Sequence, residues 1–301
     1  YYIWLYKIKG NLHSLYKFKC ESLPRVKEQY DLAISYQAPS MLPSVFVANN
    51  INSKKKVLWI HNSPSKSPCN IEYYKDSYEK YDKVFCVSQS VRDELISAFP
   101  SLKNKTDVFY NIIPIEEIIS KSNIDGGFSD NYEGIRILTI GRLSPEKGYN
   151  MAIKVCRKII DSGYKIRWYI CGEGGQRGEL ELLIKENKLE DSFILLGNKS
   201  NPYPYLKQCD IYVQTSYFEG YCTTTNEARV LRKPVITTDV SGAREQFINY
   251  ENGIIVPVDD EEIYKALIEM IDNKKLRDKF IKNLSKIDFK GNNDMYKLEL
   301  I

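Results

Sequence analysis

Ten short apolar runs, rich in β-branched, aromatic and leucine residues, recur along the chain, and segments of helical period separate most of them. The runs lie at 31–36, 56–61, 83–88, 107–111, 135–141, 166–172, 193–197, 211–216, 234–239 and 253–257. Short continuous apolar strands that alternate with helices are typical of parallel sheets covered on both faces. The alternation therefore predicts an α/β fold of doubly wound, Rossmann-like sheets.

The clearest helical segment is "NMAIKVCRKIIDSG", residues 150–163. Its apolar positions include Met151, Ile153, Val155 and Ile159, and Gly163 stands where the helix is expected to stop. This segment connects two predicted strands, as a crossover helix of a parallel sheet does.

A length of 301 residues suits about two domains. The segment 120–134 is rich in Ser, Asn, Asp and Gly and is the best linker candidate. We predict an N-terminal domain over 1–120, a linker over 121–134, a second domain over 135–287, and a C-terminal helix over 288–301 that packs back on the N-terminal domain. The first domain shows only four strand-like runs and the chain begins without methionine, so we expect this domain to be incomplete.

The composition is that of an ordinary globular protein, and no apolar run approaches the ~18 residues that a membrane span needs. The seven cysteines include no Cys-x-x-Cys pair, which favours reduced thiols in a cytoplasmic protein. Among them, Cys86, Cys156 and Cys171 occupy expected core positions of strands and helices.

Polar residues and glycines follow the predicted strands, where ligands bind in a doubly wound sheet. His61 closes one run of the first half, and "RLSPEKG" with Arg142 and Lys147 follows the run at 135–141. Gly172 and Asn198 follow the next two runs. Because the carboxyl ends of parallel strands share one edge of a sheet, these residues are expected to converge within their domain.

The most informative stretch is "SYFEGYCTTTNEARVLRKPVI", residues 216–236, which we interpret as a strand-to-helix turn. Gly220 permits close backbone approach, and the threonines Thr223 and Thr224 are N-cap candidates. The free N–H groups of a helix start bind phosphate. The glutamates Glu219 and Glu227 would repel phosphate, so we expect them to bind sugar hydroxyls. A nucleotide sugar contains both a diphosphate and sugar hydroxyls.

The Arg-x4-Lys of "GRLSPEKG" and the Glu-x7-Glu of "EGYCTTTNEARVLRKPVITTDVSGAREQF" resemble the retaining GT-B glycosyltransferases of family four ("glycosyl transferases group 1"), of the bacterial cell-surface polysaccharide type. The resemblance covers about residues 31–301. It implies two Rossmann-like domains that face a cleft, with the donor held mainly by the C-terminal domain.

The same resemblance implies roles for individual residues. Arg142 and Lys147 would bind the diphosphate, Glu219 the donor sugar, and Glu227 the ribose. His61 would face the donor sugar from the N-terminal domain. The remaining expected donor-binding positions are loops near the base and the turn around the glutamates: Gly172, Asn198, Gly220, Tyr221, Cys222, Thr223 and Thr224.

The expected reaction is retaining transfer from a nucleotide sugar, with a UDP-sugar as the favoured donor, to a glycan or lipid-linked acceptor. His61, Arg142, Lys147 and Glu219 are the expected catalytic residues. No Asp-x-Asp stands at a strand end, so we expect no obligatory metal and no cofactor. The family's first strand and glycine-rich loop are absent, Cys222 replaces a common glycine or proline, and Arg232 stands at a usual glycine.

Two other function classes stay open. A non-catalytic nucleotide-sugar-binding module would use the same residues. An NAD-dependent oxidoreductase would share the sheet type, but "GEGGQRG" places Arg177 at the third glycine of the dinucleotide fingerprint, so this stretch also fits an ordinary loop. His61 can equally be a structural histidine, and Arg142 and Lys147 a solvated helix start.

Charge is distributed unevenly along the chain. Residues 1–60 hold nine Lys or Arg against three Asp or Glu, interleaved with aromatic residues. Such a segment fits an anionic membrane surface on the inner face of the cytoplasmic membrane, or an ordinary amphipathic helix. No recognised nucleic-acid-binding module surrounds it, so we expect no nucleic-acid partner.

Overall fold

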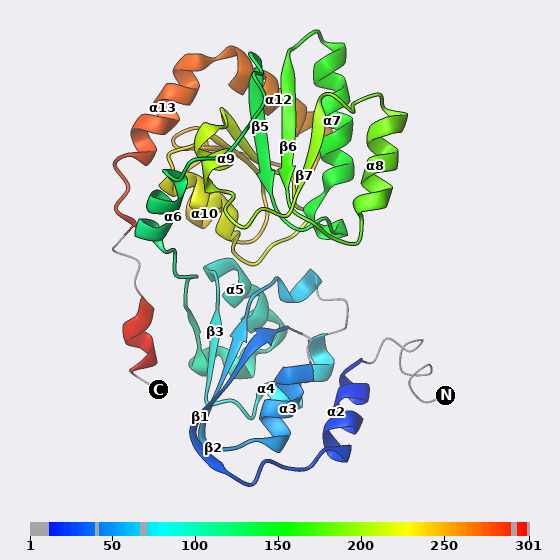
Figure 1. The fold of residues 1–301 in the computed structure, drawn as a ribbon. Coiled ribbons are helices and arrows are strands. Elements are labelled where there is room, and N and C mark those ends of the chain that lie inside the picture. The colour runs from blue at the N-terminus through cyan, green and yellow to red at the C-terminus, as the bar shows by residue number, and fades with distance from the viewer. Residues whose placement is uncertain (1–11, 40–41, 67–70, 290–293, 300–301) are drawn as a thin grey trace. The chain divides into compact units, whose positions relative to one another are not determined.

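A computed structural model describes residues 12–39, 42–66, 71–289 and 294–299 (Figure 1). The chain forms two compact units, each described by itself. Unit 1 comprises Tyr1–Ile112, Phe218–Tyr221 and Asn293–Ile301, and unit 2 comprises Ile113–Tyr217 and Cys222–Asn292. The segment 121–134, interpreted above as a linker, lies in unit 2.

Unit 1 contains a parallel four-stranded sheet in the order β1-β2-β3-β4. Its strands match the four predicted runs: β1 (Gln29–Ala38), β2 (Asn52–Ile60), β3 (Lys83–Cys86) and β4 (Thr106–Val108). Its α-helices are α2 (Leu12–Ser22), α3 (Leu42–Asn50), α4 (Lys75–Tyr78) and α5 (Gln89–Ala98).

The sequential strand order of unit 1 has a consequence for its sheet faces. Right-handed crossovers that always step in one direction place their helices on one face. On β1, Ala33 and Ser35 are buried. Alternate residues of the same strand are between 39% and 57% exposed, namely Leu32, Ile34, Tyr30 and Tyr36. Within the described residues, the second face of β1 is therefore largely open.

The last described turn of the chain, the 3₁₀ helix η6 (Asp294–Leu298), belongs to unit 1. The Tyr110 backbone N–H donates to the Asp294 carboxylate at 2.9 Å, and Lys297 Nζ donates to the Val108 carbonyl at 2.5 Å. These bonds fix η6 beside the end of β4.

Unit 2 contains a parallel six-stranded sheet in the order β10-β9-β8-β5-β6-β7. Its strands match the other six predicted runs: β5 (Ile135–Ile140), β6 (Ile166–Cys171), β7 (Phe193–Gly197), β8 (Ile211–Gln214), β9 (Val235–Thr238) and β10 (Ile254–Val256). The chain winds outward from β5 to β7, then returns to β8 and winds the other way. The strand order thus reverses between β5 and β8, which is where ligands bind in such sheets.

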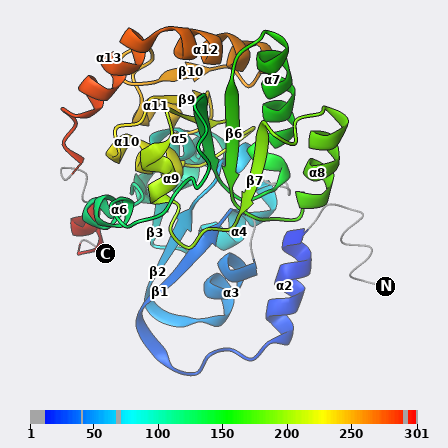
Figure 2. The same cartoon turned by 45° about the horizontal axis from the view of Figure 1, so that its top comes forward.

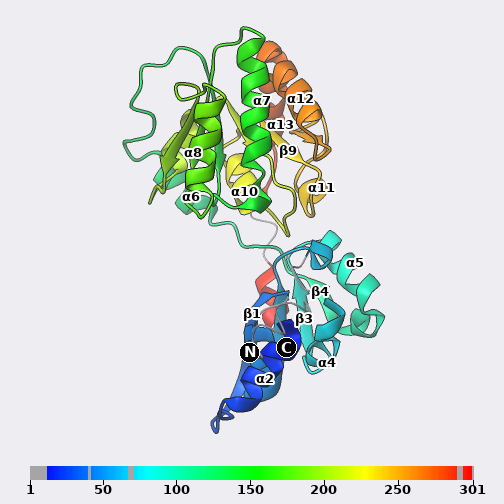
Figure 3. The same cartoon turned by 90° about the vertical axis from the view of Figure 1, so that its right-hand side faces the viewer.

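Helices cover both faces of this sheet, and Figure 2 shows α7 and α8 on the side of β5 and β6 opposite to α9 and α10. Successive residues of a strand point to opposite faces of the sheet and pack in different hydrophobic cores. Trp168 lies in the core that includes residues of α7 and α8, and Tyr169 lies in the core that includes residues of α9 and α10. Figure 3 shows α7 and α12 side by side. The helices are α6 (Ile115–Ser122), α7 (Tyr149–Asp161), α8 (Arg177–Glu186), α9 (Tyr203–Gln208), α10 (Thr223–Val230), α11 (Ala243–Gln246), α12 (Asp260–Asp272) and α13 (Lys274–Leu284).

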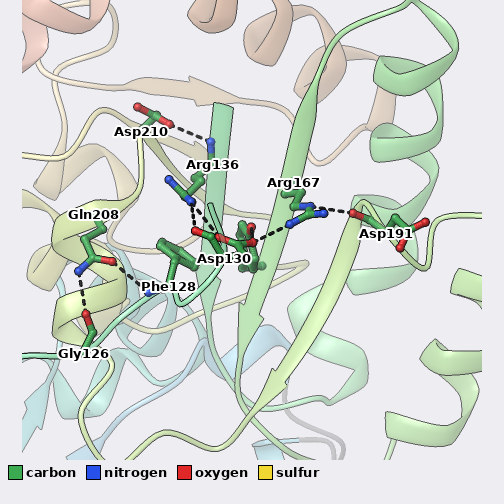
Figure 4. Close-up of polar contacts among 9 residues, drawn as sticks. Gly126, Phe128, Asp130, Arg136, Arg167, Asp191, Gln208 and Asp210 are labelled. Carbon is green, nitrogen blue, oxygen red and sulfur yellow. Dashed lines mark hydrogen bonds and ion pairs between the residues drawn. The ribbon is translucent and has the colours of Figure 1, made fainter. Parts of the chain in front are cut away.

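The segment before β5 is held tightly against unit 2. Asp130 lies between Arg136 of β5 and Arg167 of β6, with N–O distances of 2.8 and 2.7 Å, and accepts a further bond from Tyr169 (Figure 4). The Gln208 side chain accepts a hydrogen bond from the Phe128 N–H and donates one to the Gly126 carbonyl, both in the same segment. Both arginines are second residues of their strands, so this anchor lies at the amino end of the sheet, opposite to the carboxyl edge.

The six cysteines in the described residues are free thiols, and all are buried. They include the three expected core positions, Cys86, Cys156 and Cys171, whose burial confirms that interpretation. Among the described residues, no helix is both long enough and apolar enough to cross a membrane.

Candidate functional site: the carboxyl edge of the unit 2 sheet

Two loops flank the point where the strand order reverses. The loop after β5 carries Arg142 and continues into the 3₁₀ turn η4 (Pro145–Lys147), and the loop after β8 leads from Thr215 to Tyr217. Pro145 and Glu146 open only this short turn, and α7 begins after Gly148.

The two loops are bonded to each other. Thr215 Oγ1 donates to the Lys147 carbonyl at 2.8 Å, and the Tyr217 N–H donates to the Glu146 carbonyl at 2.8 Å. Gly148 has a φ of +67°, and a Cβ atom there would lie 2.2 Å from the Thr215 carbonyl oxygen. Only glycine therefore fits this close approach, which holds the Lys147 backbone beside β8.

Arg142 is an exposed cation next to a carboxylate. Its side chain is 80% exposed and lies 3.2 Å from Glu146, which also accepts a 2.6 Å bond from the Ser144 hydroxyl. Burial alone would raise the pKa of Glu146, but the Ser144 bond, its own backbone N–H and the two nearby cations lower it. An exposed ion pair is weak, so Arg142 can exchange Glu146 for an anionic ligand at little cost.

The loop after β6 packs directly on the loop after β5. At Gly172, a Cβ atom would lie 1.8 Å from the Gly141 carbonyl oxygen. At Gly174, it would lie 2.3 Å from the Leu143 carbonyl oxygen. These two glycines therefore permit contact between loops. Arg177, at the third position of the weak dinucleotide pattern, starts α8 and pairs with Glu173, four residues before it, and with Glu181, four residues after it.

The N-cap of helix α10 lies one residue before the first of the predicted threonine caps. The N-cap is Cys222, which makes no side-chain cap bond, so the expectation that Thr223 or Thr224 caps the helix is wrong. The threonine hydroxyls have other partners: Thr224 accepts from Tyr212 at 2.7 Å, and Thr225 donates to the Cys222 carbonyl at 2.8 Å. The N-cap side chain therefore does not bond the free backbone N–H groups in the first turn of α10.

Glu227 lies farther along α10 and is half-buried. The Tyr203 hydroxyl, at the start of α9, donates to its Oε1 at 3.3 Å. Burial raises the pKa of Glu227 to about 7, and the bond from Tyr203 opposes this shift. Tyr203 is not among the residues predicted from the sequence, although its place shortly after β7, in "NPYPY", was a usable signal.

Asn198, the remaining predicted site residue of unit 2, is exposed and follows β7 directly. The Gly172 N–H donates to the Gly197 carbonyl at 2.9 Å, which joins this loop to the loop after β6. Unit 2 thus gathers Arg142, Lys147, Gly172, Asn198 and the start of α10 along one edge of its sheet.

Four predicted residues lie in unit 1. His61 follows β2, is half-buried, and packs its ring against Tyr36 with centroids 4.5 Å apart. Burial lowers the pKa of His61, which keeps the imidazole neutral at pH 7, and its buried Nε2 has no hydrogen-bond partner among the described residues.

The segment of Glu219, Gly220 and Tyr221 also belongs to unit 1. Ser88 Oγ donates to the Gly220 carbonyl at 2.9 Å, and a Cβ atom at Gly220 would lie 1.9 Å from the His61 carbonyl oxygen. The close approach that the sequence predicted for Gly220 is therefore made to the His61 backbone. The two glutamates of the motif, by contrast, fall in different units.

The charged groups at the carboxyl edge of unit 2 suit an anion better than a metal ion. Within the ranges that the structure describes, no three or more His, Cys, Asp and Glu side chains form a group that could hold a metal ion. Arg142 and Lys147 instead bring two positive charges to this edge.

Comparison with known proteins identifies the family of the chain. The family model described as "Glycosyl transferases group 1" matches residues 122–286. A Campylobacter jejuni protein, N-acetylgalactosamine-N,N'-diacetylbacillosaminyl-diphospho-undecaprenol 4-alpha-N-acetylgalactosaminyltransferase, is 34% identical over 211 residues, which cover 69% of this chain and 56% of that protein. The chain therefore spans little more than half of this relative's length.

Solved structures have the same GT-B fold. A Staphylococcus aureus TarM variant, determined with UDP among its ligands, matches with a TM-score of 0.74 at 19% identity and covers 96% of this chain and 57% of its own. Anabaena Alr3699/HepE in complex with UDP matches with a TM-score of 0.72 at 19% identity and covers 96% and 81%. These likenesses establish the fold, with two Rossmann-like parts.

Proposed function

Because the chain belongs to the family of glycosyl transferases group 1, we propose that it transfers a sugar from a nucleotide-sugar donor to a glycan or lipid-linked acceptor. One observation carries this proposal. The loop of Arg142 and Lys147 and the start of α10 lie on either side of the β5–β8 switch point, where a nucleotide binds in this type of sheet.

A donor diphosphate suits the chemistry of these groups. Arg142 can form a two-pronged bond to phosphate, Lys147 adds a second positive charge, and the N–H groups of the first turn of α10 point toward an anion. When the glycosidic bond breaks, negative charge develops on the leaving diphosphate. The N–H groups at the start of α10 are held by the helix before the reaction and stabilise that charge without reorganising, and such stabilisation is usually the main source of an enzyme's rate enhancement.

The carboxylates suit the neutral parts of the donor. Glu227, on the same helix as the phosphate-binding turn, accepts hydrogen bonds from the ribose. Glu219 and His61 bind the transferred sugar, with His61 as the neutral imidazole. The loops that carry Gly172 and Asn198 border the base, and Gly220 to Thr224 form the turn around the sugar and diphosphate.

The stereochemical course is retention. Because no carboxylate is assigned as a covalent nucleophile, the acceptor hydroxyl attacks from the face that the diphosphate leaves, and the leaving phosphate takes its proton. The charge of Arg142 and Lys147 serves this step, so transfer does not require a metal ion. The test for this last point is unchanged turnover in excess EDTA.

A UDP-sugar is the proposed donor, supported by the UDP in the two solved structures of the same fold. The acceptor is lipid-linked or a growing polysaccharide, in line with the name of the C. jejuni relative, which refers to diphospho-undecaprenol. Such an acceptor places the chain at the inner face of the cytoplasmic membrane as a peripheral protein. The six cysteines in the part of the chain that the structure describes are free, buried thiols, which accords with a reducing compartment.

The experiment that tests the activity follows nucleoside diphosphate released from UDP-, GDP- and ADP-sugars. The expected result is release that depends on the chain and on one nucleotide, and a product with the donor's anomeric configuration in proton NMR. Donor binding without any release would instead support the non-catalytic binding module. Inverted configuration would contradict the retaining course.

A further inference from the structure

The start of α9 meets α10 through one pair of polar side chains. Helix α6 packs against both α9 and α10. Where they meet, the Tyr203 hydroxyl donates to Glu227 Oε1 at 3.3 Å. Both side chains are half-buried, so the bond forms in an environment that is partly shielded from water.

A carboxylate in such a place needs help to bind a diol. Burial disfavours its charged form, and protonation removes one of its acceptor sites. A hydroxyl that donates to the charged form favours that form. At Glu227, burial raises the pKa and the Tyr203 bond lowers it, so Tyr203 counteracts the effect of burial.

Tyr203 remains a donor across the working range of pH. Burial is the largest cause, and the negative charges of Glu227 and Glu117 add to it, so that the pKa of Tyr203 rises to about 12. Glu117, from α6, forms a 2.5 Å ion pair with Lys121 of the same helix. Besides the pair itself, Glu117 and its partner Lys121, both from α6, are charged groups near this bond.

From this geometry we propose that Tyr203 is a positioning residue, which orients Glu227 and keeps it charged so that it accepts hydrogen bonds from the donor ribose. The inference rests on the proposed function, because it requires that Glu227 contacts the nucleotide. It adds a residue of α9 to a site otherwise built from α10 and the strand-end loops. The bond to Oε1 leaves the second carboxylate oxygen as the acceptor for a ribose hydroxyl.

The first experiment measures the dissociation constant of UDP by calorimetry between pH 6 and pH 9.5. The proteins are the full chain, Tyr203→Phe and, as a matched control, Tyr205→Phe, which changes an aromatic ring of the same helix that packs on Phe128. We expect Tyr203→Phe to weaken UDP binding about 3- to 10-fold at pH 7, because more of Glu227 is then protonated, and to approach wild type at pH 9. Tyr205→Phe should follow the wild-type curve throughout.

The second experiment needs no ligand. Carbon-13 NMR of the glutamate carboxyl groups, with Glu227→Gln for assignment, follows the titration of Glu227 in the free chain. The expected result is a titration midpoint that moves upward in Tyr203→Phe and stays in place in Tyr205→Phe. An unchanged midpoint in Tyr203→Phe would overturn the inference.

The outcomes also separate this inference from the proposed function. If Glu227→Gln weakens UDP binding but Tyr203→Phe alters neither affinity nor its pH dependence, the role of Tyr203 is wrong and the nucleotide site stands. If Glu227→Gln leaves UDP affinity unchanged, Glu227 does not contact the nucleotide and both ideas fail at this residue.

Discussion

The hydroxyl of Thr215 donates to the backbone carbonyl of Lys147 at 2.8 Å and joins the loops that follow β8 and β5. Thr215 is fully buried and follows β8 directly, so its position is set by the sheet. The bond therefore holds the turn that carries Lys147 in place against the sheet. Residues held in this way lose little freedom when a ligand binds, which favours tight binding.

The first prediction concerns this bond. Thr215→Val keeps the shape of the side chain but leaves the Lys147 carbonyl without its donor, so we expect a loss of about 1–3 kcal/mol in unfolding free energy. Nucleoside diphosphate affinity should also fall, by about 3- to 10-fold, because the turn of Lys147 becomes mobile. Urea unfolding and calorimetry measure the two effects.

Thr139→Val is the matched control. Thr139 is also buried in unit 2, and its hydroxyl donates to the Val213 carbonyl at 2.6 Å and accepts from the Trp168 indole N–H at 3.0 Å, within the sheet. Thr139→Val should lose at least as much stability as Thr215→Val and keep its affinity for the nucleotide. Equal loss of affinity in both variants would show that the effect comes from general destabilisation.

The second prediction separates the two glutamates of the motif. Glu227→Gln should weaken binding of free UDP, because an amide is a poorer acceptor for the ribose hydroxyls. Glu219→Gln should leave free UDP binding nearly intact and reduce turnover, because UDP lacks the sugar that Glu219 contacts. Calorimetry with UDP and a donor-turnover assay are the measurements, and similar losses of UDP affinity in both variants would refute the assigned roles.

All ten strands were predictable from the sequence, because buried parallel strands are continuous apolar runs that need no knowledge of distant residues. Most of their boundaries are close to those of the predicted runs. The caps were less predictable. Whether Thr224 caps α10 depends on competition from Tyr212, which is distant in the sequence and reaches Thr224 only through the fold.

The segment 121–134 illustrates the same limit. Its content of Ser, Asn, Asp and Gly is typical of a linker, and nothing local shows that it is anchored. The partners of Asp130 are two arginines on neighbouring strands, and their proximity follows only from the pairing of β5 with β6. Likewise, the pairing of Tyr203 with Glu227 requires the packing of α9 near α10.

The third prediction concerns stability in acid. Burial would raise the pKa of Asp130, but hydrogen bonds from Tyr169, Arg136 and Arg167 lower it to about 2 in the folded protein, below the ordinary 3.8. The stabilisation is therefore complete above about pH 4 and is lost as the pH falls toward 2. Asp130→Asn should destabilise unit 2 by about 1–3 kcal/mol at pH 7, and this difference should shrink at pH 2–3.

Asp161→Asn is the control for this prediction, because Asp161 forms an ion pair with Arg157 and is 64% exposed. Its unfolding free energy should change by no more than about 0.5 kcal/mol. A difference between wild type and Asp130→Asn that is the same at pH 7 and pH 2.5 would contradict the role of the Asp130 charge.

The fourth prediction concerns the basic N-terminal segment, part of which lies outside the described residues. Trp4, Tyr6, Lys7 and Lys9 belong to that undescribed part, whereas α2 presents the exposed residues Lys17, Phe18 and Lys19. Each Lys near an anionic membrane contributes about 1 kcal/mol. We expect binding to anionic vesicles at low salt, release at high salt, and no binding to neutral vesicles in a sedimentation assay.

Charge reversal tests the location of this membrane contact. Reversing Lys7, Lys9, Lys17 and Lys19 should release the protein from vesicles without changing UDP affinity, because the groups proposed to bind the nucleotide, Arg142, Lys147 and Glu227, belong to unit 2. Reversal of four exposed lysines of unit 2 is the matched control and should leave vesicle binding in place: Lys274, Lys275, Lys282 and Lys286. Equal recovery in the supernatant with neutral and anionic vesicles at low salt would eliminate the membrane contact.

The central claim is that Arg142 and Lys147 bind the diphosphate of a nucleotide. The most direct test is the shift in unfolding temperature of the full chain with UDP, GDP, ADP and the corresponding nucleosides. We predict that at least one nucleoside diphosphate raises the unfolding temperature and that its nucleoside does not. The shift should be lost in Lys147→Ala, which forfeits roughly 2–5 kcal/mol of binding. It should shrink in Arg142→Lys, which loses the two-pronged bond, and persist in the exposed control Lys154→Ala. No shift with any nucleoside diphosphate, or an unchanged shift in both Lys147→Ala and Arg142→Lys, would contradict the account.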